Sequence, residues 1–419
     1  MTEKMTEKAY EIAKEKYAKI GVDTDAAIKK ADEISVSLHC WQCDDVIGFE
    51  NTGGALTGGI QTTGDYSGRA TTPDEVRRDM DKAFSYVPGK KKANIHAIYI
   101  DTDHAVDRNG IEPQHFSSWA DWAAERGYGL DFNPTFFSHP KSGSYSLSSY
   151  DKDIRDFWVE HGKRAEKIAE YFGERTGQLA LNNIWVHDGE KEFPIDTATH
   201  RHYLRESLDR ILDSAKGSKH HLSSVESKLF GIGSESYVVG SHEFYMGYAL
   251  TRDDVALTLD TGHFHPTELV SAKLSAILEF KDKVLLHVSR PVRWDSDHVV
   301  AFDDETRAIM REIARLDAFD RVYIATDYFD ASVNRIMALA VGARNTKKAI
   351  LEAMLQPVDA LKKLERDGDT GSRLALCEEL KTMPIGDVWD FYCAKNGVLT
   401  GTDWIADAKK YEDEVLSKR

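Results

Sequence analysis

Residues Val255–Val288 read V-A-L-T-L-D-T-G-H-F-H-P-T-E-L-V-S-A-K-L-S-A-I-L-E-F-K-D-K-V-L-L-H-V. The two ends of this stretch, Val255–Asp260 and Val284–Val288, are short apolar runs, which are typical of buried strands. Between them, Pro266–Phe280 has apolar residues at three- and four-residue spacing, and its opening Pro-Thr-Glu is typical of a helix start. The stretch therefore predicts a strand, a helix and a second strand in succession.

The same alternation extends in both directions along the chain. The other six strand candidates are also short apolar runs that end in polar residues: Ile34–Cys40, Asn94–Ile100, Tyr128–Pro134, Asn182–His187, Ser224–Phe230 and Arg321–Asp327. The other segments with helical spacing are Asp74–Val87, Phe116–Arg126, Asp153–Gly173, Ala198–Lys216 and Asp304–Leu316. Eight strands, each followed by a helix, favour an α/β fold of the (β/α)8 TIM barrel type over an open doubly wound sheet. The absence of a glycine-rich dinucleotide motif after the first strand points the same way.

Helical segments flank the predicted barrel on both sides. We expect an N-terminal helical extension over residues 1–33, a catalytic barrel over 34–335 and a C-terminal helical region over 336–419. The C-terminal region is too long for one barrel helix, so we expect it to wrap the barrel or another subunit. The glycine-rich segment Asn51–Gly68 is either an ordinary surface loop or a lid over the barrel mouth.

The composition limits the classes of partner. The chain has 419 residues, 41% of them hydrophobic, and a formal net charge of −16. This acidity argues against a nucleic-acid partner, because phosphate binding needs a basic surface. No apolar run reaches the ~18 residues of a membrane span, and the first residues are charged rather than signal-like. We therefore expect a cytoplasmic protein with no membrane partner.

The four cysteines do not form a disulfide framework or a zinc ribbon. Cys40 and Cys43 form C-W-Q-C, which has redox or zinc half-site spacing. A zinc ribbon needs a second close pair, and a thioredoxin motif should open a helix, whereas two aspartates follow here. We interpret the pair as incidental.

Acids and imidazoles collect at the predicted ends of the later strands. Barrel active sites lie at the carboxyl ends of the strands, and buried carboxylates are rare unless they are paired or bind a metal. We interpret four of these residues as the ligand shell of one metal ion: Glu226, Asp260, His287 and Asp327. A second shell close by consists of His263, Asp295 and Asp297. This mixed oxygen and nitrogen set favours Mg²⁺ or Mn²⁺ over a thiolate zinc site. Taken singly, each residue is also consistent with a capped loop or a salt bridge.

Other residues at the strand ends are candidates for binding a substrate. Lys228 follows Glu226 by two residues, so we expect both side chains on the same side of one strand. It is either a salt-bridge partner or a group that polarises a substrate oxygen. Trp41, Trp185 and Phe132 either form an apolar wall for a sugar or belong to the core. His96, at the end of the second strand, is a further substrate-binding candidate.

Several motifs resemble L-rhamnose isomerases, and the resemblance covers nearly the whole chain. The motifs are H-C-W-Q-x-D-D-V-x-G-F-E (His39–Glu50), V-E-S-K-L-F-G-I-G (Val225–Gly233), E-F-Y-M-G-Y-A (Glu243–Ala249), D-x-G-H-F-H-P-T-E (Asp260–Glu268), L-L-H-V-S-R-P-V-R-W-D-S-D-H-V-V (Leu285–Val300) and F-D-A-S-x-N-R (Phe329–Arg335). The resemblance implies a relative of xylose isomerase with a (β/α)8 barrel and two divalent ions. These are typically Mn²⁺, with Co²⁺ or Mg²⁺ as other choices. It also implies a cytoplasmic homotetramer that interconverts L-rhamnose and L-rhamnulose.

The resemblance also implies roles for individual residues. The first shell, which contains Glu226, matches the ligands of the structural metal, and the second shell, which contains His263, matches those of the catalytic metal. In the hydride-shift route thought to be used by the family, we expect a water or hydroxide on the catalytic metal, held by Asp295 or Asp327, to handle the hydroxyl proton, and Lys228 is a candidate for polarising a substrate oxygen. One departure is Cys43, where the family is expected to have glycine.

Three alternatives remain open. A two-metal barrel hydrolase would usually carry H-x-H at the end of the first strand, where this chain has H-C-W. A catalytically silent sugar-binding protein would have lost metal ligands, and the chain retains the whole set. An isomerase of the same fold could instead prefer another aldose, such as L-mannose or L-lyxose.

Overall fold

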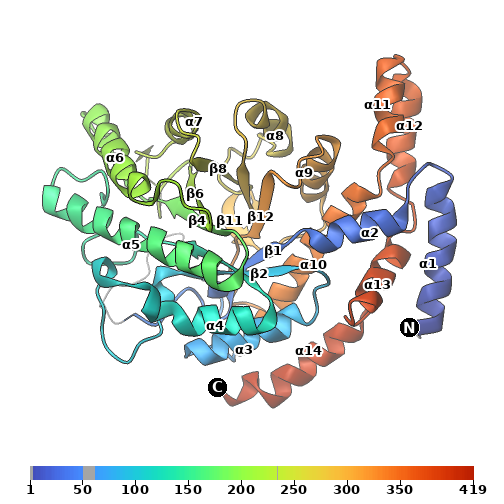
Figure 1. Ribbon diagram of the computed structural model, residues 1–419, viewed down its shortest axis with the longest axis horizontal. Coiled ribbons are helices and arrows are strands. Elements are labelled where there is room, and N and C mark those ends of the chain that lie inside the picture. Colours follow the sequence, from blue (N-terminus) through green and yellow to red (C-terminus); the bar gives the residue numbers. More distant parts are fainter. Residues whose placement is uncertain (1–2, 51–61, 234) are drawn as a thin grey trace.

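The computed structural model describes residues 3–50, 62–233 and 235–419. Within them, eight parallel strands close into a barrel with the order β1-β12-β9-β8-β6-β4-β3-β2 (Figure 1). The strands are β1 (Val36–His39), β2 (Lys91–His96), β3 (Gly129–Asn133), β4 (Ala180–Trp185), β6 (His221–Glu226), β8 (Val255–Asp260), β9 (Val284–Val288) and β12 (Val322–Thr326). Because successive barrel strands are neighbours in the ring, the predicted TIM barrel is confirmed.

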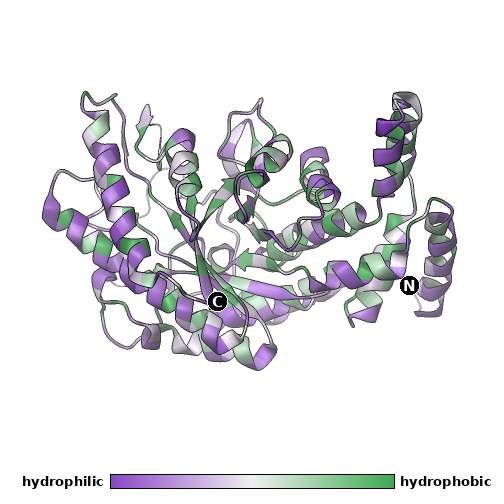
Figure 2. Ribbon diagram, turned by 45° about the horizontal axis from the view of Figure 1, so that its top comes forward, coloured by the Kyte–Doolittle hydropathy of each residue, from purple (hydrophilic) through white to green (hydrophobic). Residues whose placement is uncertain are grey.

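A helix follows each barrel strand and returns the chain to the start of the next. These helices are α3 (Pro73–Phe84), α4 (Ser117–Arg126), α5 (Lys152–Thr176), α6 (Thr197–Leu212), α7 (His242–Leu250), α8 (Ser271–Leu278), α9 (Asp304–Arg315) and α10 (Arg335–Met354). They carry both hydrophobic and hydrophilic residues (Figure 2), as helices with one buried face do. Side-chain caps begin several of them: Thr72 accepts from the backbone N–H of Glu75, and Asp303 from that of Thr306.

One helix begins later than its sequence signal predicts. Pro266 was the expected start, but α8 begins at Ser271. The backbone N–H and the hydroxyl of Ser271 both donate to the carboxylate of Glu305 in α9, each at 2.9 Å. The start of α8 therefore depends on a contact with another helix, which local sequence does not reveal.

Three strands lie closer to the N-terminus than predicted, and one of them is β4, which spans Ala180–Trp185 and not Asn182–His187. The structure has β2 at Lys91–His96 and β6 at His221–Glu226, whereas the expected ranges were Asn94–Ile100 and Ser224–Phe230. The polar residues that open β2 and β6 are paired inside the protein: Lys92 binds Asp131, and His221 lies between two glutamates. Lys228 consequently lies in the loop after β6 and not on the strand.

The terminal helices pack outside the barrel. They are α1 (Glu3–Ala18) and α2 (Thr24–Glu33) at the start, and α11 (Val358–Arg366), α12 (Thr370–Leu380), α13 (Ile385–Lys395) and α14 (Asp403–Glu414) at the end. Figure 1 shows α11 and α12 projecting together and α1 beside α13. The hydroxyl of Tyr86 donates to Asp407 of α14 at 2.8 Å, and Arg419 binds Asp79 of α3 at 2.6 Å. The chain's end is therefore fastened to the barrel.

The predicted boundary at residue 335 falls at the start of α10. This helix packs against α9, α2 and α3, so it occupies the place of the eighth helix of the ring. The division at 33, 335 and 419 stays a prediction, and we favour including α10 in the catalytic unit. Among the described residues, no helix is both long and apolar enough to cross a membrane.

Two short antiparallel strand pairs lie on the loops. In the first, β5 (Gly189–Glu190) pairs with β7 (Tyr237–Val238), and the second is the hairpin of β10 (Arg290–Val292) and β11 (Trp294–His298). The expected loop after β9 is therefore a hairpin. Residues 51–61 of the glycine-rich segment proposed as a lid lie outside the described residues.

Candidate active site

A cavity opens at the carboxyl ends of the barrel strands. Its lining includes most of the side chains singled out in the sequence: Trp41, His96, Trp185, Glu226, Lys228, His263, His287, Asp297 and Asp327. Asp260 and Asp295 lie directly behind this lining, because both contact His263. The structure therefore brings together residues from every part of the barrel.

The first predicted metal shell converges because its members come from consecutive strands of the ring. Glu226, Asp260 and His287 are on β6, β8 and β9, and Asp327 directly follows β12. His287 Nδ1 lies 3.2 Å from Glu226 Oε1, 3.3 Å from Asp327 Oδ2 and 3.9 Å from Asp260 Oδ2. All four residues are buried, and one ligand atom from each fits within the span of a single cation site.

The second predicted shell adjoins the first. His263 Nε2 lies 3.5 Å from Asp295 Oδ2 and 3.9 Å from Asp260 Oδ2, so Asp260 borders both groups. Asp297 comes from the same hairpin as Asp295 and lines the cavity. Its backbone φ of 45° is in the left-handed region, which costs a non-glycine residue about 1 kcal/mol. The strained hairpin thereby places the Asp297 carboxylate in the cavity lining and that of Asp295 directly behind it.

Several polar atoms of this cluster have no hydrogen-bond partner in the described part of the chain. They are Asp260 Oδ2, His287 Nε2, Asp295 Oδ1 and Asp327 Oδ1, and each is inaccessible to solvent. Buried polar atoms are normally paired, since leaving one unpaired costs free energy. Oxygen and imidazole nitrogen donors without partners, gathered in one place, fit divalent cations.

The electrostatics of the cluster lead to the same interpretation. Burial and the nearby Glu226 raise the pKa of Asp260 well above its usual range, and burial and Asp295 do the same for Asp297. Burial also raises the pKa of Asp327, to about 6. Glu226 behaves differently: burial opposes its ionisation, but His287 and His263 outweigh this and lower its pKa to about 2. Without a cation the carboxyl groups must share protons, and bound cations remove that need.

Lys228 still reaches the cluster from its loop. Its Nζ lies 2.6 Å from Asp295 Oδ2 and 5.2 Å from the ring centre of Trp185. Burial lowers the pKa of the ammonium, but the charges of Asp295 and Asp297 outweigh burial and raise it overall. The lysine is therefore held as a cation at the edge of the cavity.

Aromatic rings form the opposite wall of the cavity. The rings of His39 and Trp41 stack at 4.7 Å, and those of Trp41 and His96 at 4.1 Å. Phe329 meets Trp41 edge-on at 5.6 Å, and Phe137 packs on Trp185 at 5.3 Å. Such a surface suits the C–H face of a sugar.

Phe132 does not belong to this wall. Its ring packs edge-on against Phe116 at 5.3 Å and against Phe172 of α5 at 5.8 Å. Side chains alternate along a strand, and because Asn133 faces the cavity, Phe132 faces the helices. The expectation that it binds substrate is wrong, and it is a core residue.

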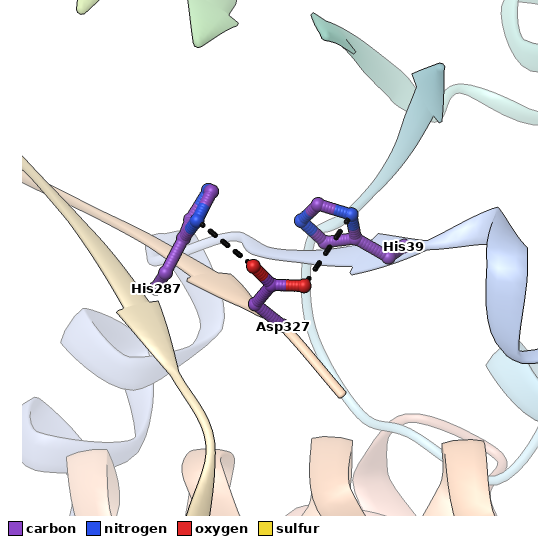
Figure 3. Close-up of side chains that lie close together, drawn as sticks. All are labelled: His39, His287 and Asp327. Carbon is purple, nitrogen blue, oxygen red and sulfur yellow. Dashed lines mark ion pairs between the residues drawn. The ribbon is translucent and has the colours of Figure 1, made fainter. Parts of the chain in front are cut away.

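Sequence reasoning left several lining residues unassigned: His39, Asn133, Thr135, Phe137, Asn183 and Phe329. Figure 3 shows His39 beside Asp327 and His287, with 3.9 Å between His39 Nδ1 and Asp327 Oδ1. His39 ends the first strand, a position that could have marked it as a candidate. The asparagines carry no comparable signal in the sequence.

The two cysteines of C-W-Q-C lie in the core. Cys40 and Cys43 are both fully buried and free. Burial and the charge of Asp44 raise the pKa of the Cys40 thiol, and burial and Asp79 raise that of Cys43. Buried thiols held in the neutral form are unreactive, as expected of an incidental pair.

Comparison with known proteins agrees with this geometry. Residues 4–419 match the family profile described as L-rhamnose isomerase (RhaA). The chain belongs to the L-rhamnose isomerase family. An L-rhamnose isomerase of Listeria monocytogenes serotype 4a is 56% identical over 413 residues, 98% of both chains. Those of Mannheimia succiniciproducens and Enterobacter sp. strain 638 are 55% and 52% identical, over 99% of this chain and of each relative.

Proposed function

We propose that this chain interconverts L-rhamnose and L-rhamnulose and holds two divalent cations, Mn²⁺ by preference. As a member of the L-rhamnose isomerase family it is an aldose–ketose isomerase. The observation that carries the metal requirement is the set of buried oxygen and nitrogen donors without partners in the described part of the chain at the carboxyl ends of β8, β9 and β12, beside Glu226 of β6. The comparisons do not favour the alternative preference for L-mannose or L-lyxose.

We assign two ligand sets. Glu226, Asp260, His287 and Asp327 would hold one cation, and His263, Asp295 and Asp297 the other, with Asp260 between them. When bound, the cations supply Lewis acidity toward the oxygens on C1 and C2, which favours a hydride shift between these carbons. The remaining chemistry belongs to the side chains.

The proton that moves between O1 and O2 needs a carrier. Asp295 and Asp327 are the candidates, because each has a buried carboxylate oxygen without a partner in the described part of the chain. Asp327 also lines the cavity, so its carboxylate lies within reach of a bound sugar. Lys228, kept charged by Asp295, would donate to a sugar oxygen and stabilise negative charge that develops there.

The wall of the cavity would orient the sugar. Trp41, Trp185 and His96 offer ring faces and edges to its apolar side, while the acids face its hydroxyl groups. Closing such a cavity against water protects the hydride shift from side reactions. We further propose, from the resemblance, that the protein acts in the cytoplasm as a homotetramer.

The test is reconstitution. The purified protein is stripped with EDTA and mixed with L-rhamnose, with and without Mn²⁺, and ketose formation is measured. We expect turnover only after Mn²⁺ is added, and about two Mn²⁺ per chain by elemental analysis. A folded, metal-loaded protein that forms no ketose from L-rhamnose but isomerises L-mannose or L-lyxose would refute the substrate assignment. Binding of one Mn²⁺ with full activity would refute the two-ion site.

A further inference from the structure

A row of amide side chains crosses the barrel interior and connects Glu226 with the aromatic wall. It consists of Asn183 on β4, Asn133 on β3 and Asn94 on β2, called the amide relay below. All three are buried, with exposed fractions of 2%, 5% and 1%. Because an amide has a donor end and an acceptor end, each contact in the row restricts the next.

The carboxylate of Glu226 determines the orientation of the first amide, Asn183. The Asn183 Nδ2 group donates to Glu226 Oε2 and, at 3.2 Å, to Asn133 Oδ1. Its Oδ1 accepts from the hydroxyls of Ser224 at 3.0 Å and Thr258 at 2.7 Å. An ionised carboxylate can only accept, so the NH₂ of Asn183 must face Glu226. The opposite orientation would place two oxygens against each other.

The orientation of Asn183 then determines the orientations of Asn133 and Asn94. Since Asn133 Oδ1 accepts from Asn183, its Nδ2 is left to donate to Asn94 Oδ1. The Nδ2 of Asn94 is therefore the atom that faces His39 Nε2, at 3.2 Å. Each amide is thus used at both ends with a single orientation.

Two imidazoles continue the row of hydrogen bonds. His39 Nε2 accepts from Asn94, so the neutral ring carries its proton on Nδ1 and donates to His96 Nε2 at 2.9 Å. His96 Nε2 therefore accepts, and its proton lies on Nδ1, which faces Thr135 Oγ1 at 3.2 Å. The Thr135 hydroxyl can accept this bond while donating to the Asn133 carbonyl at 3.3 Å.

These hydrogen bonds distinguish His39 from the metal ligands that surround it. Figure 3 shows the ring close to Asp327 and His287, near enough for the three to hold an ion together. Both ring nitrogens are already used, however, Nε2 as an acceptor and Nδ1–H as a donor. A neutral imidazole arranged in this way has no lone pair free for a cation.

We propose that the amide relay and His39 are positioning elements that hold His96 as its Nδ1–H tautomer, with its ring fixed against Trp41. Glu226 determines the orientation of the amides. The same carboxylate therefore faces the metal site and, through the amide relay, orients His96 on the other side of the cavity. The value of this arrangement for sugar binding rests on the proposed function, but the tautomers do not.

The Asn94→Asp substitution tests the proposal because it should exchange the donor and acceptor nitrogens of both imidazoles. Aspartate has almost the same shape but can only accept, so His39 must then donate through Nε2, and its Nδ1 accepts from His96. Protein labelled with [¹⁵N]histidine is measured by NMR without metal or sugar, at about pH 8.5, where the imidazoles are neutral. Signals are assigned with His39→Asn and His96→Asn. We expect Nδ1–H on both rings of the wild type and Nε2–H on both rings of the variant.

Thr135→Val is the matched control. It removes the hydroxyl at the end of the hydrogen-bonded row. His96 should keep the Nδ1–H tautomer because its contact with His39 imposes it. If Thr135→Val changes the tautomer, or if Asn94→Asp leaves it unchanged, the proposal is overturned. Should Asn94→Asp not fold, neutron diffraction of metal-free wild-type crystals locates the same protons directly, and a proton on Nε2 of either ring overturns it.

A kinetic readout separates this proposal from the proposed function. Asn94→Asp should lower kcat/KM for L-rhamnose roughly tenfold, which is the scale of one well-placed hydrogen bond. Binding of Mn²⁺ should be unchanged in His39→Asn, and its loss would show that His39 is a ligand after all. If the wild type shows the expected tautomers but does not isomerise L-rhamnose, the proposed substrate fails and the relay stands.

Discussion

The β6–β12 side of the cavity is built from ionisable groups, whereas the β1–β4 side is built from aromatic rings, neutral imidazoles and amides. On the first side, polar atoms such as Asp260 Oδ2 and Asp327 Oδ1 have no partner in the described part of the chain. On the second side, His39 and His96 use both ring nitrogens in hydrogen bonds. The difference indicates that the first side is completed by cations, whereas the imidazoles of the second side are already paired in the fold.

The sharpest test of this comparison is Asp260→Asn. The substitution keeps the shape of a residue that borders both proposed ion sites but removes its charge. We expect kcat/KM to fall about 1,000-fold, the upper scale for losing one preorganised electrostatic contact, and Mn²⁺ binding by calorimetry to weaken. The metal-free variant should unfold at a temperature no lower than the metal-free wild type, because burial and Glu226 already disfavour the charged form of Asp260 in the metal-free protein. Unchanged Mn²⁺ affinity would contradict the assignment.

Lys228→Met tests the cation at the border between the two sides. Methionine keeps most of the volume and removes the ammonium that lies 2.6 Å from Asp295. We expect kcat/KM to fall about 100-fold, with both ions still bound by elemental analysis. Lys228→Arg, which retains the charge, should recover part of the loss. Full turnover in Lys228→Met would mean that the lysine is only a salt-bridge partner.

Trp41→Ala tests the aromatic side alone. The indole stacks on both His39 and His96, and its removal leaves the proposed sugar surface incomplete. We expect KM for L-rhamnose to rise about tenfold, the equivalent of ~1.4 kcal/mol. Mn²⁺ affinity should stay the same, and Trp41→Phe should lie between the variant and the wild type. A large loss of Mn²⁺ affinity would show that the two sides are not independent.

The smallest expected effect concerns pH. Burial raises the pKa of Asp327 from 3.8 to about 6 in the metal-free protein. The folded state therefore binds more protons than the unfolded state between these values, and its stability should fall as pH rises from about 4 to about 6. Urea unfolding of the stripped wild type should show this loss, and Asp327→Asn should show less of it. Equal pH dependence in both proteins would place the titration on another group.

The order of the elements could be predicted because it depends on local patterns. The stretch Val255–Val288 shows two apolar runs around a helical spacing, and the same pattern recurs around the ring. The boundaries were less accurate where tertiary pairing overrides local signals. Lys92 and His221 look like loop residues in the sequence, but in the fold they pair with Asp131 and with the glutamates of α5. Ser271, where α8 begins, donates to Glu305 of the neighbouring helix.

The sequence by itself determined the barrel and the acids at its carboxyl ends, because strand ends in a closed parallel barrel must meet in one place. Only the tertiary structure decided which neutral residues face the cavity. Phe132 and Asn133 are adjacent on one strand, and the alternation of side chains sends one to the helices and the other to the site. The direction of the amide relay was also decided there, since a hydrogen bond between distant residues acquires its donor and acceptor only when the fold brings them into contact.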